Sequence, residues 1–275
     1  MKPLNFILLL FLSFLEICFA LKPNFSAETR LRLENFHNDT ITTASTASYL
    51  RSRLNIDFSS RYYKIYFQLQ DSRLLGNQEN SPGIAGGINT SPALHQIYGE
   101  LNSPFGGRNK IRFGRFEMPL GNQRLFSKNN WNNQGRSFEG LTNTRKTKRG
   151  DVLFFHLINT DLYPMNDQFD YIIDGVYGSA KVNFTRPPEQ TIDSESNFSK
   201  ESPLSLEYYI FNENIVINPG TNTKRRQTLG FRLTKSFKRI NIETEYAYQT
   251  GKFYLDEIKA SLASINIEIP LNFSP

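Results

Sequence analysis

The 275-residue chain contains one cysteine, Cys18, and three histidines, His37, His95 and His156. The cysteine lies in an N-terminal segment that we expect to be removed, so the mature chain has no thiol for a disulfide or a cysteine-ligated metal. The histidines are isolated, and no H-E-x-x-H motif, P-loop or G-x-S-x-G element occurs. The sequence predicts neither a metal site nor a cofactor.

Long hydrophobic runs are also missing after residue 20. Residues 1–20 have the order of a signal peptide, with Lys2 at the start, an apolar run over Phe6–Phe14 and a small-x-small cleavage site ending at Ala20. No later apolar run reaches the length of a membrane helix. We therefore expect a signal peptide over residues 1–20 and one domain over residues 21–275, which can lie in a membrane only as a β-barrel.

Charge is spread along the chain rather than gathered in a tail. There are 32 basic and 26 acidic residues, a net charge of +6. Without a basic arm we expect no nucleic-acid partner. The basic balance favours anionic small solutes, anionic polysaccharide or lipid headgroups as partners.

The strongest structural signal is alternation of apolar and polar residues. In Tyr62–Asp71, Tyr63, Ile65, Phe67 and Leu69 alternate with Lys64, Tyr66, Gln68 and Gln70. A soluble sandwich turns the apolar set inward, whereas a transmembrane barrel turns it towards lipid. Alternation alone does not distinguish the two.

Strand length and loop order favour the barrel. The alternating segments run about nine to eleven residues, enough to cross a bilayer when tilted. Short turns at 59–61 and 103–108 alternate with long loops at 77–91 and 119–135. We expect about twelve antiparallel strands in an all-β transmembrane barrel, with a bulge near Ala263. If the mature N-terminus is periplasmic, both long loops are extracellular. The segment 185–203 is then a tolerated insertion, a gate or plug on the periplasmic side, or the sign of a miscounted strand.

Several short motifs resemble those of one family of outer membrane barrels, in order along residues 27–270. They are Arg30–Glu34, Gln68–Arg73, His95–Tyr98, Gly114–Glu117, Gly121–Leu125, Trp131 with Gly135–Gly140, Thr228–Arg232 and Glu245–Gly251. As a set they resemble the alginate-export family. The resemblance implies a bacterial outer membrane location, folding by the barrel assembly machinery, and passive export of a polyuronate such as alginate.

The chain also departs from that family's pattern. Phe116 stands where the family favours Gln, and Glu139 where it favours Asp. Family barrels have near eighteen strands, so we interpret this chain as a truncated or divergent member.

Two sets of candidate site residues follow from the barrel interpretation. With the apolar parity facing lipid, seven bases and only three acids, Glu34, Asp57 and Glu100, share the lumen face, so this basic wall would attract carboxylates in transit. The bases are Arg30, Arg32, Arg51, Arg53, Lys64, Lys110 and Arg112. A second set would hold the loop after the fifth strand folded inward as a constriction: Arg115, Glu117, Arg124, Trp131 and Arg136. The alternative for the wall is a set of Arg–Glu ladders that brace the barrel.

The predicted function is a porin-like channel for anionic solutes, and two alternatives remain. One is a surface-exposed scaffold or adhesin barrel without a conducting pore. The other is a glycosidic enzyme using Glu100, Glu117 or Glu139, although each of these fits the strand pattern without catalysis. The oligomeric state stays open.

Overall fold

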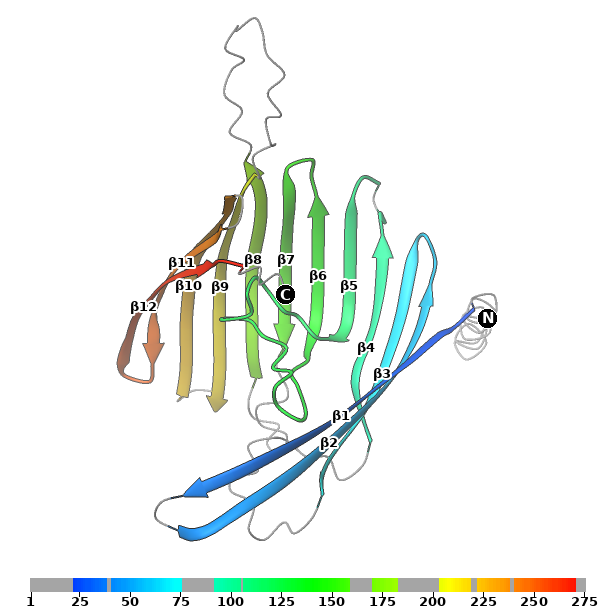
Figure 1. The fold of residues 1–275 in the computed structure, drawn as a ribbon. Helices are drawn as coiled ribbons and strands as arrows, with labels where there is room; N and C mark the ends of the chain where they lie inside the picture. Colours follow the sequence, from blue (N-terminus) through cyan, green and yellow to red (C-terminus); the bar gives the residue numbers. More distant parts are fainter. Residues whose placement is uncertain are drawn as a thin grey trace, which may run out of the picture. The chain divides into compact units, whose positions relative to one another are not determined.

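The computed structural model describes residues 22–38, 41–75, 92–104, 106–158, 170–182, 203–218, 222–237 and 240–270. The predicted signal peptide, the loop predicted at 77–91 and all but Pro203 of the loop predicted at 185–203 lie outside the described residues. The described chain forms twelve antiparallel strands that follow one another in the sheet in chain order (Figure 1). No described helix is long and apolar enough to span a membrane. The expected all-β class and strand number are confirmed.

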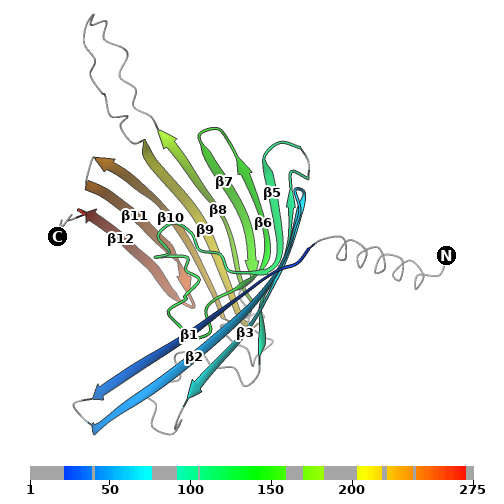
Figure 2. The same cartoon turned by 45° about the vertical axis from the view of Figure 1, so that its right-hand side comes forward.

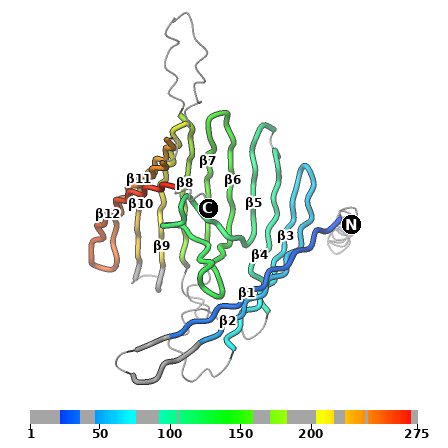
Figure 3. Tube along the Cα trace, viewed as in Figure 1, coloured from blue at the N-terminus to red at the C-terminus, as the bar shows by residue number. Residues whose placement is uncertain are grey.

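The chain divides into two compact units, residues 1–141 and 142–275, which we describe separately. The first unit holds β1 (Asn24–Asn38), β2 (Ile41–Ser59), β3 (Tyr63–Leu75), β4 (Ala93–Asn102) and β5 (Asn109–Phe116). The second holds β7 (Gly150–Ile158), β8 (Asp170–Val182), β9 (Leu204–Asn218), β10 (Asn222–Phe237), β11 (Ile240–Phe253) and β12 (Asp256–Glu268). β6 (Phe138–Lys146) contains the boundary between the units. Figure 3 traces the same path without ribbons.

Several strands are longer than their alternating segments. β2 has 19 residues, although alternation is clear only from Tyr49 onward. The extra residues pair with β1 in register as far as Ser45 opposite Phe36, and the pairing ends, after a register shift, at Ile41 opposite Asn38. Backbone hydrogen bonds continue the hairpin where side-chain alternation has stopped, and hydropathy does not detect such a continuation.

The structure resolves which way the alternating faces point. In the first unit Leu31, Leu33 and Phe113 are about half exposed or more, whereas Arg51 and Gln70 are almost fully buried. A water-soluble protein buries the opposite set. We call the exposed apolar face the outer face and the opposite one the inner face. The burial pattern is that of a sheet whose outer face meets lipid.

The second unit has the same arrangement, and the height of its apolar band can be measured along β11. The outward positions from Ile240 to Tyr248 are Ile, Ile, Thr, Tyr and Tyr, and the next outward positions are Thr250 and Lys252. Eight residue steps of an extended strand cover roughly 27 Å. That length, shortened by strand tilt, suits the ~25 Å apolar band of outer membrane barrels.

The irregularities of the sheet fall elsewhere than expected. The pairing of β11 with β12 is unbroken from Asn241 opposite Glu268 to Phe253 opposite Asp256, so the predicted bulge near Ala263 is wrong. The apolar residues of β12 change faces while its backbone stays regular. A register shift occurs instead in β4, where Gln68 pairs with Gln96 but Leu69 pairs with Leu94. His95 is the extra residue.

Candidate functional site

The candidate site is built around the loop of residues 117–137, which joins β5 to β6. Figure 2 shows it as the green trace that connects the end of β5 to the start of β6. Within the first unit its backbone is bound by side chains from the inner faces of β1, β2 and β3. The loop therefore lies against the inner face rather than extending away from the strand ends.

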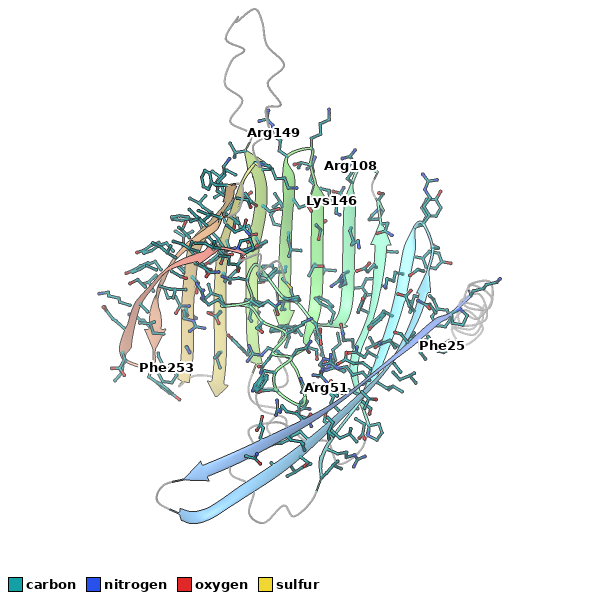
Figure 4. All side chains as sticks on the ribbon, viewed as in Figure 1. Phe25, Arg51, Arg108, Lys146, Arg149 and Phe253 are labelled. Atoms are coloured by element: carbon teal, nitrogen blue, oxygen red, sulfur yellow. The ribbon has the colours of Figure 1, made fainter. Side chains whose placement is uncertain are left out.

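Three arginines from β1 and β2 donate to consecutive backbone carbonyls of the loop. Nη2 of Arg30 lies 3.3 Å from the Trp131 oxygen and 3.1 Å from the Asn132 oxygen, and its Nη1 donates to Asn130. Arg32 donates to Trp131, and Nη1 of Arg51 lies 3.3 Å from the Asn130 oxygen. A guanidinium group offers five N–H donors in a fixed plane, which suits several carbonyls at once. Arg51 is labelled in Figure 4.

Strand β3 and Asn133 continue this attachment. Oγ of Ser72 donates to the Asn133 carbonyl at 3.0 Å, and Nε2 of Gln70 donates to the Gln134 carbonyl at 2.5 Å. Nδ2 of Asn133 lies 3.4 Å from the carbonyl oxygens of Leu50 and Arg73. The Asn133 side chain is fully buried. Side chains thus provide the loop with partners that a neighbouring strand would otherwise supply.

Trp131 lies at the exposed tip of this attachment. Its ring is 5.0 Å from the guanidinium carbon of Arg32, which also lies 4.7 Å from the Tyr49 ring. Trp131 itself is 72 % exposed. The Trp131 ring therefore packs against Arg32, while most of the tryptophan side chain stays exposed.

The base of the loop is fixed by a largely buried carboxylate, Glu117. Its Oε1 lies 3.2 Å from Nη1 of Arg53 and 3.0 Å from Nε2 of His95. Its backbone N–H donates to Oε1 of Gln96 at 3.0 Å. Burial raises the pKa of Glu117, but the His95 hydrogen bond and the Arg53 charge outweigh it and hold the pKa below its ordinary value. Glu117 is therefore ionised at neutral pH.

The bulge in β4 makes this arrangement possible. In a regular strand, adjacent residues point to opposite faces. The extra residue turns both His95 and Gln96 to the inner face, where both are buried. Bulges commonly re-aim side chains in this way. His95 then reaches Glu117, and Gln96 links Glu117 to Gln68 through a 3.0 Å hydrogen bond.

The other residues predicted to brace the loop lie in different places. Arg115 is on the outer face and pairs with Glu139 at 3.1 Å. Arg124 is in a turn, where its N–H donates to Oδ1 of Asn122 at 3.1 Å. The N–H of Arg136 donates to the Lys128 carbonyl at 2.8 Å and joins the two arms of the loop.

The seven bases of the predicted wall all belong to inner-face strand positions. Nζ of Lys110 and Nη2 of Arg112 lie 3.0 and 2.6 Å from the Glu100 carboxylate, and Lys64 pairs with Asp57. Arg32 pairs with Glu34, Arg51 with Glu28 and Arg53 with Glu117. Among the described residues, six of the seven bases therefore form ion pairs with five acids. Arg30 is bound by carbonyls alone among its described contacts.

The inner face of the second unit differs in charge. Arg226 binds Glu213 at 2.5 Å, and Arg232 binds Glu207 and, at 2.8 Å, Glu243. Tyr209 donates to Glu245 at 2.9 Å. Carboxylates therefore outnumber guanidinium groups in this network, and the basic excess belongs to the first unit.

Sequence reasoning did not identify His95, Gln96, Gln70 or Asn133 as parts of the site. The adjacent polar residues of the segment L-H-Q-I-Y break the strand alternation, and this break was the available signal for the bulge. Asn133 is one of several asparagines around Trp131, and nothing in the sequence distinguishes it from its neighbours.

A family model described as alginate export matches residues 22–272. A comparison with curated proteins gives no match. Among solved structures, two engineered variants of a Rhodopseudomonas blastica porin are similar at 9 % identity. Each alignment covers 90 % of this chain and 100 % of the porin, with TM-scores of 0.29 and 0.30. The assignment to a family rests on the first of these matches.

Proposed function

Since the chain belongs to the alginate export family, we propose that it acts in a bacterial outer membrane as a channel through which anionic solutes diffuse. The outer face that meets lipid and the charged inner face support this proposal. No covalent chemistry is involved. The export signal near Ala20 and the barrel assembly machinery belong to the proposal as the route by which the chain reaches that membrane.

One observation carries the anion preference: arginines of β1 and β2 hold the loop through neutral carbonyls. A carbonyl accepts a hydrogen bond without cancelling the positive charge of its donor. Arg30 has only such partners among its described contacts, and the ion pairs described for the seven wall bases involve only five acids. Such a wall attracts anions as charged rings do in other pores. A polyuronate carries a carboxylate on every sugar and fits this chemistry.

The loop supplies the narrow part of the proposed pathway. It occupies the inner face beside β1, β2 and β3, and it exposes Trp131 next to Arg32. A solute that passes along this face meets an aromatic ring and guanidinium groups together. Aromatic rings pack against sugar faces, while guanidinium groups bind carboxylates.

The test is single-channel recording of the refolded mature chain in a planar bilayer under a salt gradient. We expect discrete conductance steps with a reversal potential on the anion-selective side. Arg30→Gln should move the reversal potential towards zero, whereas Arg61→Gln, in the turn between β2 and β3, should leave it nearly unchanged. A cation-selective or unselective wild-type channel would contradict the proposed anion pathway.

Two observations favour the scaffold alternative. The arginines of β1 and β2 are already occupied by the loop, and the inner face of the second unit buries Phe155, Leu157 and Phe211. Membrane insertion without conductance, in the wild type and in a variant with the loop released, would favour a barrel without a pore.

A further inference from the structure

A group of bases lies on the outer face of the second unit, just beyond its apolar band. Arg225 of β10 is directly opposite Lys252 of β11, and Lys259 of β12 is opposite Thr250, the next outward residue of β11. All three bases are exposed. We call Arg225, Lys252 and Lys259 the rim cluster. This end of β11 is marked by Phe253 in Figure 4.

The strand register places the rim cluster at the edge of the lipid-facing surface. Leu229 and Tyr248 are directly opposite each other on the outer face and are 60 % and 41 % exposed. Gln227 and Thr250 form the next outward pair, and Arg225 and Lys252 the one after it. Two such steps cover roughly 13 Å along a strand. The bases therefore lie where hydrocarbon gives way to lipid headgroups.

Two members of the rim cluster have no acidic partner among the described contacts. Glu257 is opposite Lys252, but its carboxylate pairs with Lys259 at 2.7 Å. The contacts described for Arg225 and Lys252 include no carboxylate. Like charges directly opposite each other destabilise a strand pair. Two bases held side by side at a membrane edge indicate an anion supplied from outside the chain.

Polar neighbours extend the same surface along the sheet. Asn214 of β9 is opposite Arg225, and Asn212 is opposite Gln227. Their amide groups both donate and accept hydrogen bonds, as recognition of a hydroxylated headgroup requires. The surface thus combines an apolar band, two bases without a described ion pair, and amide side chains in adjacent rows.

We propose that the rim cluster binds the phosphate groups of a glycolipid in the adjacent membrane leaflet. Arg225 offers a planar pair of N–H donors for two phosphate oxygens, and Lys252 adds a point charge from the facing strand. Acyl chains of the same lipid then lie against Leu229 and Tyr248. A soluble anion would not need an apolar surface beside its phosphate site. This inference does not depend on conduction by the inner face.

The test measures binding of bisphosphorylated lipid A to the refolded mature chain in detergent. Each base near an anionic surface strengthens binding by about fivefold. Arg225→Gln with Lys252→Gln should therefore weaken binding by about 30-fold. The matched control, Lys148→Gln with Arg149→Gln, removes the same charge from exposed positions in the turn between β6 and β7, whose Arg149 lies at the other end of the second unit from Phe253 (Figure 4), and should change binding less than about threefold.

Further measurements distinguish a lipid phosphate from a soluble one, and the loss of charge from misfolding. Dephosphorylated lipid A should bind as weakly to the wild type as the intact lipid binds to the double variant. The swap Arg225→Lys with Lys252→Arg keeps both charges and should retain most of the affinity, which separates charge from folding. The proposal is overturned if both glutamine variants lose affinity equally, if neither does, if dephosphorylated lipid A binds normally, or if inorganic phosphate binds as tightly as the lipid.

Discussion

Replacing Glu117 by glutamine tests how the loop of residues 117–137 is held. The Glu117 side chain is 13 % exposed and pairs with Arg53, which is 4 % exposed, at 3.2 Å. A hydrogen bond to a charged group contributes about 1.5–3 kcal/mol, and leaving a buried charge without its partner costs about 3–5 kcal/mol. Glutamine keeps an acceptor for Arg53, so we expect a cost of about 2 kcal/mol to loop docking.

A cost of that size raises the fraction of molecules with a detached loop by about 30-fold. Trypsin cleavage after Lys128 reports this fraction, because the Lys128 carbonyl is bound to the Arg136 N–H in the docked loop. When opening and closing are fast relative to cleavage, the cleavage rate follows the open population. The Glu117→Gln protein should therefore be cut about 30-fold faster than the wild type.

Glu139→Gln is the matched control. It breaks another Arg–Glu pair, Arg115 with Glu139, whose side chains are 22 % and 48 % exposed on the outer face. Exposed pairs contribute about 0–1 kcal/mol, so cleavage should rise less than about fivefold. Unchanged cleavage in Glu117→Gln, or equal acceleration in both variants, would refute the role assigned to Glu117.

Three other perturbations address the same region. The pKa of Glu117 is lowered, so its contribution to loop docking is complete above the unfolded pKa of about 4.3 and is lost as pH falls through the lower folded value. Trp131 fluorescence should therefore be constant from about pH 5 to 8 and change in acid. The Glu117→Gln protein should not show this change. His95→Ala removes one partner of Glu117, at a cost of about 1 kcal/mol, and should speed cleavage about fivefold; an unchanged rate would exclude a role for the bulge. Gly114 has φ +119° and its added Cβ would meet the Ile97 carbonyl oxygen, so Gly114→Ala should lower the urea midpoint of the refolded protein, and an unaltered midpoint would contradict the strain argument.

The strands of this fold could be predicted from sequence because alternation is a local property. The segment from Tyr63 to Gln70 shows it without gaps, and it lies within β3. The direction of the faces is not local. It depends on whether water or lipid meets the apolar residues, and the sequence carries the same alternation in both cases. Burial of Arg51 and exposure of Leu54 decide it.

The candidate site was predictable only in part, for a related reason. Alternation placed Arg30 and Arg51 on the inner face, and the structure has them there. Their partners are backbone carbonyls about 80 to 100 residues away along the chain. Carbonyl groups carry no sequence signal, so the path of the loop decides which arginine they meet. The inward position of Glu117 also depended on the strand ending at Phe116, which strand parity alone did not specify.

The central claim is that the apolar face of these strands meets lipid and the charged face does not. Leu54 and Asn55 are adjacent residues of β2, one on each face. The only cysteine, Cys18, lies in the predicted signal peptide, so single cysteines at these positions give unambiguous labels. In proteoliposomes, a fluorophore on Leu54→Cys should be quenched by brominated acyl chains, and one on Asn55→Cys should not. Equal quenching at both positions, or quenching at Asn55→Cys alone, would contradict the assignment of the faces.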